Sequence, residues 1–567
     1  MQTGWVKPPK PIMGLDHVGT QSPCTLIYSQ LLPGITNVTD RARYYSFYPW
    51  IVRCLDTRYK EASIESYIDF YRRADCLLTL ISERHARTLE DEHHGEAMIG
   101  RLRLVPALTK LEEGKELKLS TYATREDGSD ERYFQNRLGG LGQYYAGQLA
   151  ELRILNASGG EWVTYTPEAG TPLAKALDTI PEANRFWNCV DADVITLDDL
   201  DALQAFCICK LNNQEEERSL LLDLFFARTE FFRLPSQSGN YDPSFRRDSL
   251  ALLLHLAHDL SSDASVRLSE ETFRAVVYSG RLPGNNEWKL SPALENVRVL
   301  WSIYQRNDLL SIAILAVFSA ALHGLDATIQ FHRRFDTVEQ FAHELAREQS
   351  VRDCLSSLMP ESGDSPRCEA RFSSFIEHIG ATHPALGNWQ DPNHEISLAK
   401  NLISHPASLH KYEAPIAEAL KMLALLAVRA PEFPVGYGSL LVTASDLQNY
   451  PINLISFTRH IDEWSNLSLV EVVEKLTSWI LNTHLSVALR KLRQTRQSSF
   501  HIEPSEFGLK TAGEVPSPVA TLPRIRQALQ VLADVGALKY INLQSANSER
   551  YLVITDLGES ILESKHA

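Results

Sequence analysis

The sequence has little positive charge. It contains 56 lysine and arginine residues against 71 aspartate and glutamate residues in 567, which gives a formal net charge of -15 at pH 7. Proteins that bind polyanions over most of their surface usually have the opposite charge balance. The composition therefore argues against a protein that binds nucleic acid over its whole surface. Any contact with nucleic acid must come from a local basic patch.

Cysteine is also sparse, with 8 residues scattered along the chain. Only Cys207 and Cys209, in FCICK, are close together. The single residue between them is too little for the usual paired zinc knuckle, and no second pair follows. The pattern predicts reduced, mostly buried thiols in a cytosolic protein, with no metal site and no cofactor.

Long hydrophobic runs are almost absent. The first residues, MQTGWVKPPKPIMG, contain no apolar core of signal-peptide length. The longest apolar stretch, Leu309 to Leu325, is at the short limit for spanning a bilayer and contains Ser311, Ser319 and His323. We therefore expect a buried helix, no membrane contact and a cytoplasmic location.

The common catalytic motifs are missing. The sequence contains no GxxxxGK[ST] loop, no GxGxxG after a strand and no GxSxG nucleophile elbow. His255 and His258 have i, i+3 spacing, but no HExxH-type carboxylate accompanies them, which favours a partly buried pair. An enzyme is therefore not the favoured interpretation.

One run of competent metal ligands is present. The segment EDEHHGE, Glu90 to Glu96, contains two histidines and four carboxylates. Adjacent histidines point about 100° apart on a helix, so the whole run cannot converge on one ion. We interpret it as a solvated, charged end of a helix.

Helical periodicity dominates what remains. Residues 1 to about 34 contain many prolines and glycines and are expected to be extended, and from Asn37 onward helices are expected. Thr39 or Asp40 can cap the first of them, and Pro49 is expected either to break it or to begin a new first turn. Further long helices are predicted over SIESYIDFYRRADCLLTLISERHA, RDSLALLLHLAHDL, NVRVLWSIYQRNDLLSIAILAVFSAALHGL and LSLVEVVEKLTSWILNTHLSVALRKLRQ.

The segment ITNVTDRARYYSFYPW is rich in aromatic residues. Exposed aromatic side chains among arginines can stack on nucleic-acid bases. Here Tyr44, Phe47 and Tyr48 fall on one side of the expected helix, and a periodic aromatic stripe is more often part of a core. We expect core packing, with Arg41 and Arg43 left as candidates to face a partner.

Two stretches share a pattern. The pattern occurs in Leu138 to Leu177 and again in Leu522 to Leu562. In each segment it predicts an amphipathic helix, then a two-stranded hairpin, then another helix. A threonine follows the hairpin, and a glycine comes three or four residues after the threonine. This order resembles winged-helix domains, in which a recognition helix precedes a two-stranded wing. The fold class predicted is mainly α, a multi-domain helical protein with two winged-helix-like (α+β) units.

The domain organisation follows from these segments. We predict an N-terminal helical region with an extended arm over residues 1–99 and a winged-helix-like domain over 100–185. Central helical domains follow over 186–500, and a second winged-helix-like domain occupies 505–567.

Two groups of residues are candidates for nucleic-acid contact. An amphipathic basic helix directly precedes the C-terminal unit and is suited to phosphates, although a solvated helix face is an equally good interpretation. The expected recognition helix offers side chains that can reach base edges or phosphates. The phosphate candidates are Arg490, Lys491, Arg493 and Arg496, and the groove candidates are Arg524, Arg526 and Gln527.

Three stretches also suggest a family resemblance. They are GLDHVGTQSPCTLIYSQLLPGITNVTDRARYYSFYPW, WSIYQRNDLLSIAILAVFSAALHGL and HLSVALRKLRQTRQSSFHIEPSEFGL. Together they resemble helical proteins encoded in bacterial anti-phage defence operons beside ATPase or nuclease genes, such as those of the Menshen-type three-gene system. The resemblance implies a non-catalytic, nucleic-acid-sensing or scaffold subunit and assigns no functional residue.

The favoured function is recognition of nucleic acid, most of all DNA, as the sensing subunit of a multi-protein bacterial defence complex. One alternative is a scaffold that docks a partner ATPase or nuclease through its winged helices. A second alternative is a metal-dependent nuclease, although no compact set of carboxylates and lysine stands out.

Overall fold

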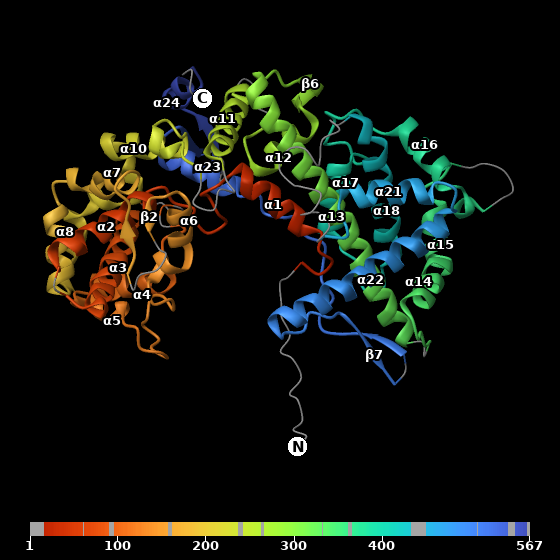
Figure 1. Cartoon of the computed structure of the whole chain (residues 1–567), viewed down its shortest axis with the longest axis horizontal. Coiled ribbons are helices and arrows are strands. Elements are labelled where there is room, and N and C mark those ends of the chain that lie inside the picture. Colours follow the sequence, from red (N-terminus) through yellow and green to blue (C-terminus); the bar gives the residue numbers. More distant parts are fainter. Residues whose placement is uncertain are drawn as a thin grey trace. The chain divides into compact units, whose positions relative to one another are not determined.

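The computed structural model describes residues 16–60, 62–89, 94, 96–156, 162–235, 242–261, 266–330, 333–360, 366–432, 450–506, 508–542 and 550–563. Within them the chain is mainly helical, as predicted (Figure 1). Strands occur there only as two-stranded antiparallel sheets. These pair β1 (Leu117–Lys118) with β4 (Val194–Ile195), β2 (Leu155–Asn156) with β3 (Thr164–Tyr165), β5 (Arg281–Leu282) with β6 (Asn286–Glu287), β7 (Ile502–Ser505) with β8 (Gly508–Thr511), and β9 (Leu538–Asn542) with β10 (Arg550–Ile554).

Two compact units make up the chain, and neither is continuous in sequence. Unit 1 contains the described residues up to Tyr28 and Arg274–Pro523, and unit 2 contains Ser29–Phe273 and the described residues from Arg524 onward. This division differs from the predicted one, because it splits 1–99 and 186–500 between the units. Composition marks loops along a sequence, whereas packing decides which distant segments share a core.

Unit 1 is built around α13 (Pro292–Gln330), which packs against α18 (Glu413–Val428), α17 (Glu395–Ser404) and α22 (Leu469–Thr495). By length and composition α13 is apolar enough to cross a membrane, but 94% of its most apolar window is buried inside the protein. The predicted buried helix is therefore confirmed. The other α-helices described wholly within this unit are α14 (Val338–Arg347), α15 (Gln349–Ser356), α16 (Phe372–Thr382) and α21 (Leu454–Trp464). The division between the units falls within α1 (Gln21–Leu31) and within α12 (Glu270–Ser279).

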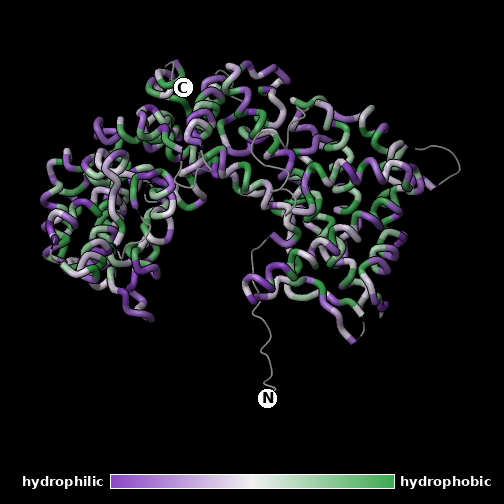
Figure 2. Tube along the Cα trace, in the orientation of Figure 1, coloured by the Kyte–Doolittle hydropathy of each residue, from purple (hydrophilic) through white to green (hydrophobic). Residues whose placement is uncertain are grey.

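Unit 2 is organised by α2 (Tyr44–Arg58), which packs against α3 (Ile64–Leu89) and α7 (Gly170–Lys175). Its aromatic stripe is fully buried, so the predicted core role of this segment is confirmed. The other α-helices are α4 (Arg101–Glu112), α5 (Leu119–Ala123), α6 (Ala146–Glu151), α8 (Ala183–Ala192), α9 (Leu197–Ala202), α10 (Glu215–Phe225), α11 (Pro243–Leu260), α23 (Ile525–Asp534) and α24 (Asp556–Glu563). Hydrophobic and hydrophilic residues alternate along most helices in Figure 2, as amphipathic packing requires.

Two local predictions are wrong. Residues 16–34 are not extended, because α1 (Gln21–Leu31) forms there. The Asp16 carboxylate accepts hydrogen bonds from backbone N–H groups of Gly19, Thr20, Gln21 and Ser22, which satisfies the donors at the start of the helix.

The second error concerns α2. Pro49 lies inside the helix without ending it, and neither Thr39 nor Asp40 caps it, since the N-cap residue is Arg43. A proline in a helix interior costs about 3 kcal/mol. Burial of Tyr44, Tyr48 and Trp50 on both sides of it offsets this cost.

The first predicted hairpin closes through a threonine. After β3, the backbone N–H of Thr166 donates to the Ile154 carbonyl at 3.0 Å and its hydroxyl donates to the Arg153 carbonyl at 2.5 Å. The same hydroxyl accepts the backbone N–H of Gly170, at the start of α7, at 2.9 Å. A Cβ atom on Gly170 would collide with the carbonyl oxygen of Ile154.

The C-terminal hairpin closes in the same way. After β10, the backbone N–H of Thr555 donates to the Ala537 carbonyl at 3.1 Å and its hydroxyl donates to the Gly536 carbonyl at 2.6 Å. The Thr555 hydroxyl accepts the backbone N–H of Gly558 at 3.2 Å, and a Cβ atom on Gly558 would collide with the Ala537 carbonyl oxygen. The shared threonine and glycine pattern therefore corresponds to one shared backbone closure.

This closure leads to a stability prediction. Gly170→Ala should destabilise unit 2 by about 1–3 kcal/mol, because the new methyl group has no room beside a backbone oxygen. Gly147→Ala is the matched control, since no atom lies within 4 Å of the added methyl group. The control should be neutral or stabilising by up to about 1 kcal/mol. Equal midpoints of urea unfolding for the two variants would contradict the closure.

Candidate functional site

The predicted basic helix is the C-terminal end of α22. Arg493 and Arg496 are exposed there and Arg490 is half-buried. Lys491 is also half-buried, and its Nζ donates a hydrogen bond to the backbone carbonyl of Asp16. Burial lowers the pKa of Lys491. The exposed positive charge at this helix end therefore comes mainly from Arg493 and Arg496.

The three groove candidates on α23 are placed differently from one another. Arg524 donates to the Ile35 carbonyl at 2.8 Å and to the Ser29 hydroxyl at 3.0 Å. Gln527 is buried and donates to the Asp40 carboxylate at 2.9 Å. Of the three, Arg526 is exposed, Arg524 is half-buried and Gln527 is buried, and contact with a nucleic-acid groove stays a prediction.

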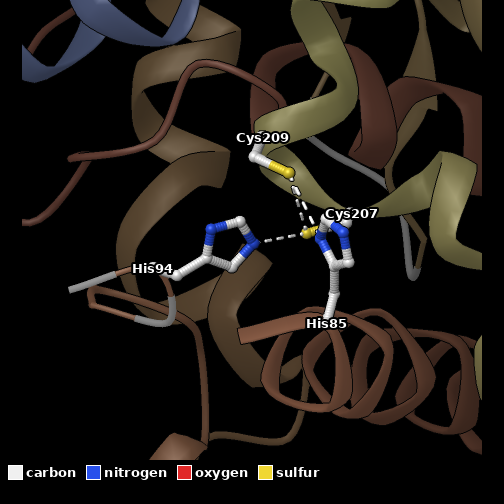
Figure 3. A group of neighbouring side chains, drawn as sticks. All are labelled: His85, His94, Cys207 and Cys209. Atoms are coloured by element: carbon white, nitrogen blue, oxygen red, sulfur yellow. Dashed lines mark hydrogen bonds between the residues drawn. The ribbon is translucent and has the colours of Figure 1, made fainter. Parts of the chain in front are cut away.

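A third group of side chains converges inside unit 2. His85 lies on the last turns of α3, His94 in the loop that follows, and Cys207 and Cys209 at the start of the short 3-10 helix η4 (Ile208–Asn213). Their ligand atoms all lie within 4.8 Å of one another. Figure 3 shows the four side chains pointing toward a common centre.

The distances within this cluster are close to those of a tetrahedral ligand set. The His94 Nε2 atom is 3.0 Å from the Cys207 Sγ atom, and the His85 Nδ1 atom is 3.3 Å from the Cys209 Sγ atom. The two sulfur atoms are 3.6 Å apart. Zinc bonds of about 2.3 Å to sulfur and about 2.0 Å to nitrogen place tetrahedral ligand atoms about 3.3–3.8 Å apart. One ion would therefore reach all four atoms after small side-chain movements.

The two thiols have opposite electrostatic environments. Burial raises the pKa of Cys207, but hydrogen bonds from Cys209, His85 and His94 outweigh it and hold this pKa well below its usual range. The pKa of Cys209 is raised by its hydrogen bond to Cys207 and by burial. The cluster thus stabilises one thiolate at Cys207, and a cation at its centre would favour the thiolate at both positions.

Arg43 fixes the segment that carries the cysteines. Its guanidinium donates to the backbone carbonyls of Ala205 at 2.9 Å and Cys207 at 2.6 Å. The same group forms a two-point ion pair with Glu217 at 3.1 and 2.6 Å, and both side chains are fully buried. The hydroxyl of Ser46 adds a hydrogen bond to Glu217 at 2.6 Å.

Arg41 fixes the segment that carries His94. Its guanidinium donates to the backbone carbonyls of His94 at 3.4 Å and Glu96 at 3.0 Å. It also forms a two-point ion pair with Asp534 on α23, with both distances 3.0 Å. Arg41 and Arg43, which the sequence left as candidates to face a partner, are therefore buried supports of the cluster.

The sequence pattern does not predict this arrangement, because FCICK and EDEHHGE are far apart in the chain and His85 belongs to neither. The interpretation of EDEHHGE as a solvated helix end is wrong for His94, which is only 9% exposed. Glu90, Asp91, Glu92 and His93 lie outside the described residues. A closely spaced cysteine pair together with a histidine-rich run is the signal that could have identified the site.

The donor set restricts the chemistry. Thiolate and imidazole suit zinc and other borderline or soft metals, whereas Mg²⁺ prefers oxygen ligands. Among the described residues, this is the only such group of three or more, and it contains no carboxylate. It therefore gives no support to a magnesium-dependent nuclease. No protein-family model matches the chain, and no curated protein or solved structure matches it.

A separate cluster of histidines lies in unit 1. His17 Nδ1 is 3.0 Å from His501 Nε2, and His484 accepts the backbone N–H of His501 at 2.9 Å. Burial, followed by repulsion from the neighbouring histidines, lowers the pKa of His17 to about 3. Burial lowers the pKa of His484 to about 4 and also lowers that of His501. The cluster is therefore held in its neutral form, beside Lys491.

This cluster predicts acid sensitivity. Below the ordinary histidine pKa of 6.5 the unfolded chain takes up protons that folded His17 and His484 do not, until the pH reaches about 3 to 4. The stability of unit 1 should therefore fall as the pH falls through this window. Between about pH 7 and pH 5 the urea-unfolding midpoint should therefore fall. In His17→Gln this fall should be smaller than in the unchanged protein, because one of the protonation differences is removed.

His258→Gln is the control for that measurement. A hydrogen bond to Glu559 raises the pKa of His258, so this residue changes stability with pH in the opposite direction. Removing it should not reduce the acid loss. An unchanged pH dependence in His17→Gln would contradict the role assigned to the cluster.

The buried ion pair predicts a large mutational effect. Arg43→Met leaves Glu217 buried without its charge partner and should destabilise unit 2 by about 3–5 kcal/mol. Arg137→Met is the matched control, because Arg137 and its partner Glu65 are 55% and 56% exposed. Such an exposed pair contributes about 0–1 kcal/mol. Similar losses in urea-unfolding midpoint for both variants would contradict the central role of Arg43.

Proposed function

We propose that the chain is a non-catalytic subunit that recognises nucleic acid, in the first place DNA, within a cytoplasmic bacterial defence complex. The observation that carries the proposal is the exposed end of α22. Arg493 and Arg496 lie there with the exposed amides Gln494 and Gln497, in a chain whose net charge is -15. A local cationic surface of this kind is what an acidic protein needs to contact phosphates.

The C-terminal part of unit 2 supports the same proposal. We interpret α23, β9, β10 and α24 as a winged-helix-like unit, and α6, β2, β3 and α7 as a second one. On β9, Lys539 and Tyr540 are exposed, and the guanidinium of Arg550 on β10 lies 4.1 Å from the centre of the Tyr540 ring. A wing that combines cations with an exposed aromatic ring suits contact with a nucleic-acid backbone and its bases.

The exposed cations predict the result of a binding titration. Fluorescence anisotropy of the full chain with duplex, hairpin and single-stranded DNA, and with RNA of the same sequence, should show salt-sensitive binding. In Arg493→Ala/Arg496→Ala the affinity at low salt should fall, because two phosphate contacts are lost. For duplex DNA the slope of log K against log salt should fall by about 1.8, since each contact contributes about 0.9.

Arg334→Ala/Arg352→Ala is the matched control. It removes the same charge from unit 1, but from ion pairs with Asp336 and Glu369. It should leave the slope unchanged if the end of α22 binds phosphates directly. Absence of binding at low salt would refute nucleic-acid recognition by the isolated chain and favour a scaffold that docks an ATPase or nuclease. Equal effects of the two double variants would show that DNA binding depends on the net charge of the protein and not on the end of α22.

A further inference from the structure

We infer that His85, His94, Cys207 and Cys209 bind one structural Zn²⁺ ion, which joins three segments of unit 2. This inference is independent of nucleic-acid binding. Two imidazoles and two thiols are a standard ligand set for structural zinc, and four-coordinate tetrahedral geometry is the usual arrangement for such sites. The side chains in Figure 3 come from α3, from the loop after it and from the start of η4.

Burial favours a structural ion over a catalytic one. Cys207 is 0% exposed, His85 4% and His94 9%, and Cys209 is only partly exposed. A catalytic zinc ion keeps one position for water or substrate, whereas here four protein ligands fill the tetrahedron. The same burial argues against Cys207 as a nucleophile activated by His94, since a substrate would have no access to its sulfur.

The distances exclude two other interpretations of the cysteine pair. The sulfur atoms are 3.6 Å apart, whereas a disulfide bond requires about 2.0 Å. In a two-iron cluster with mixed ligands, the histidine pair and the cysteine pair bind different irons. In this protein each sulfur lies directly beside an imidazole nitrogen, at 3.0 and 3.3 Å, so the four ligands converge on a single centre.

The surrounding residues orient the ligands as supporting residues of metal sites do. Arg43 binds the Cys207 backbone carbonyl, and Arg41 binds the His94 backbone carbonyl. Both guanidinium groups are held by buried carboxylates, Glu217 and Asp534. The ligand-bearing loops are thus fixed from outside the cluster, and the ion would join them from inside.

The position of the site indicates what the ion does. The loop after α3 also provides Glu96, which forms an ion pair with Arg550 of β10 at 3.4 Å. The Cys207 segment leads into η4, which packs against α23. Metal binding would therefore hold α3 and η4 together at the place where the C-terminal helix and hairpin pack in unit 2.

The test is the metal content of the full chain. Plasma mass spectrometry after gel filtration should find about one zinc ion per chain. Replacement with Co²⁺ should give the visible absorption of tetrahedral cobalt and a thiolate-to-cobalt charge-transfer band. Removal of zinc with a chelator should lower the urea-unfolding midpoint, and stoichiometric Zn²⁺ should restore it, because binding to the folded state alone stabilises it.

Variants separate ligation from simple packing. Cys207→Ser should lose the metal, whereas Cys189→Ser, which changes another buried thiol of unit 2, should retain it. Cys209→His keeps a competent ligand, so it should retain zinc while the charge-transfer band falls to about half, in proportion to the thiolates that remain. This variant keeps the test decisive even if Cys207→Ser does not fold.

Three results would overturn the inference. The first is a zinc content below about 0.1 per chain in folded protein after incubation with Zn²⁺, since a complete structural site is filled at stoichiometric metal. The second is a cobalt spectrum without a thiolate band. The third is an equal loss of metal in Cys189→Ser and Cys207→Ser.

Discussion

The structure of unit 2 depends on two buried guanidinium groups. Arg41 and Arg43 precede α2 directly, and each binds a buried carboxylate together with backbone carbonyls of a distant loop. A buried charge is tolerated only when it is paired and its donors are satisfied. These requirements fix the loops after α3 and before η4 relative to α2. Two of the metal-ligand candidates, His94 and Cys207, lie on these loops, and His85 and Cys209 lie on the adjoining α3 and η4.

The same constraint explains why the end of the sequence belongs to the core of its first part. The carboxylate of Asp534 on α23 accepts a hydrogen bond from Arg41, and Arg524 donates to the backbone carbonyl of Ile35. The C-terminal helix therefore packs against residues 29–43 as part of the same core. The hairpin beyond it closes through Thr555 in the way that Thr166 closes the earlier one. Unit 2 thus contains the same closure twice, and η4, which carries Cys209, packs against the α23 helix that precedes the C-terminal hairpin.

Much of this fold is predictable from local pattern. Periodicity identifies α13 and α22, the aromatic spacing identifies the buried face of α2, and the threonine and glycine pattern identifies both hairpins. The cluster is not local, because His94 and Cys207 are 113 positions apart. Local rules also fail at Pro49, where packing outweighs the proline penalty, and at α1, whose cap at Asp16 lies several residues before the helix.

X-ray absorption at the zinc edge of the purified full chain would measure the bond lengths to the inferred ion. An ion bound by two histidines and two cysteines has two sulfur neighbours at about 2.3 Å and two nitrogen neighbours at about 2.0 Å. Because sulfur and nitrogen scatter differently, this ligand set is distinguishable from nonspecific binding to surface carboxylates. A shell of oxygen and nitrogen without sulfur, or protein that contains no zinc, would rule out the inferred zinc site.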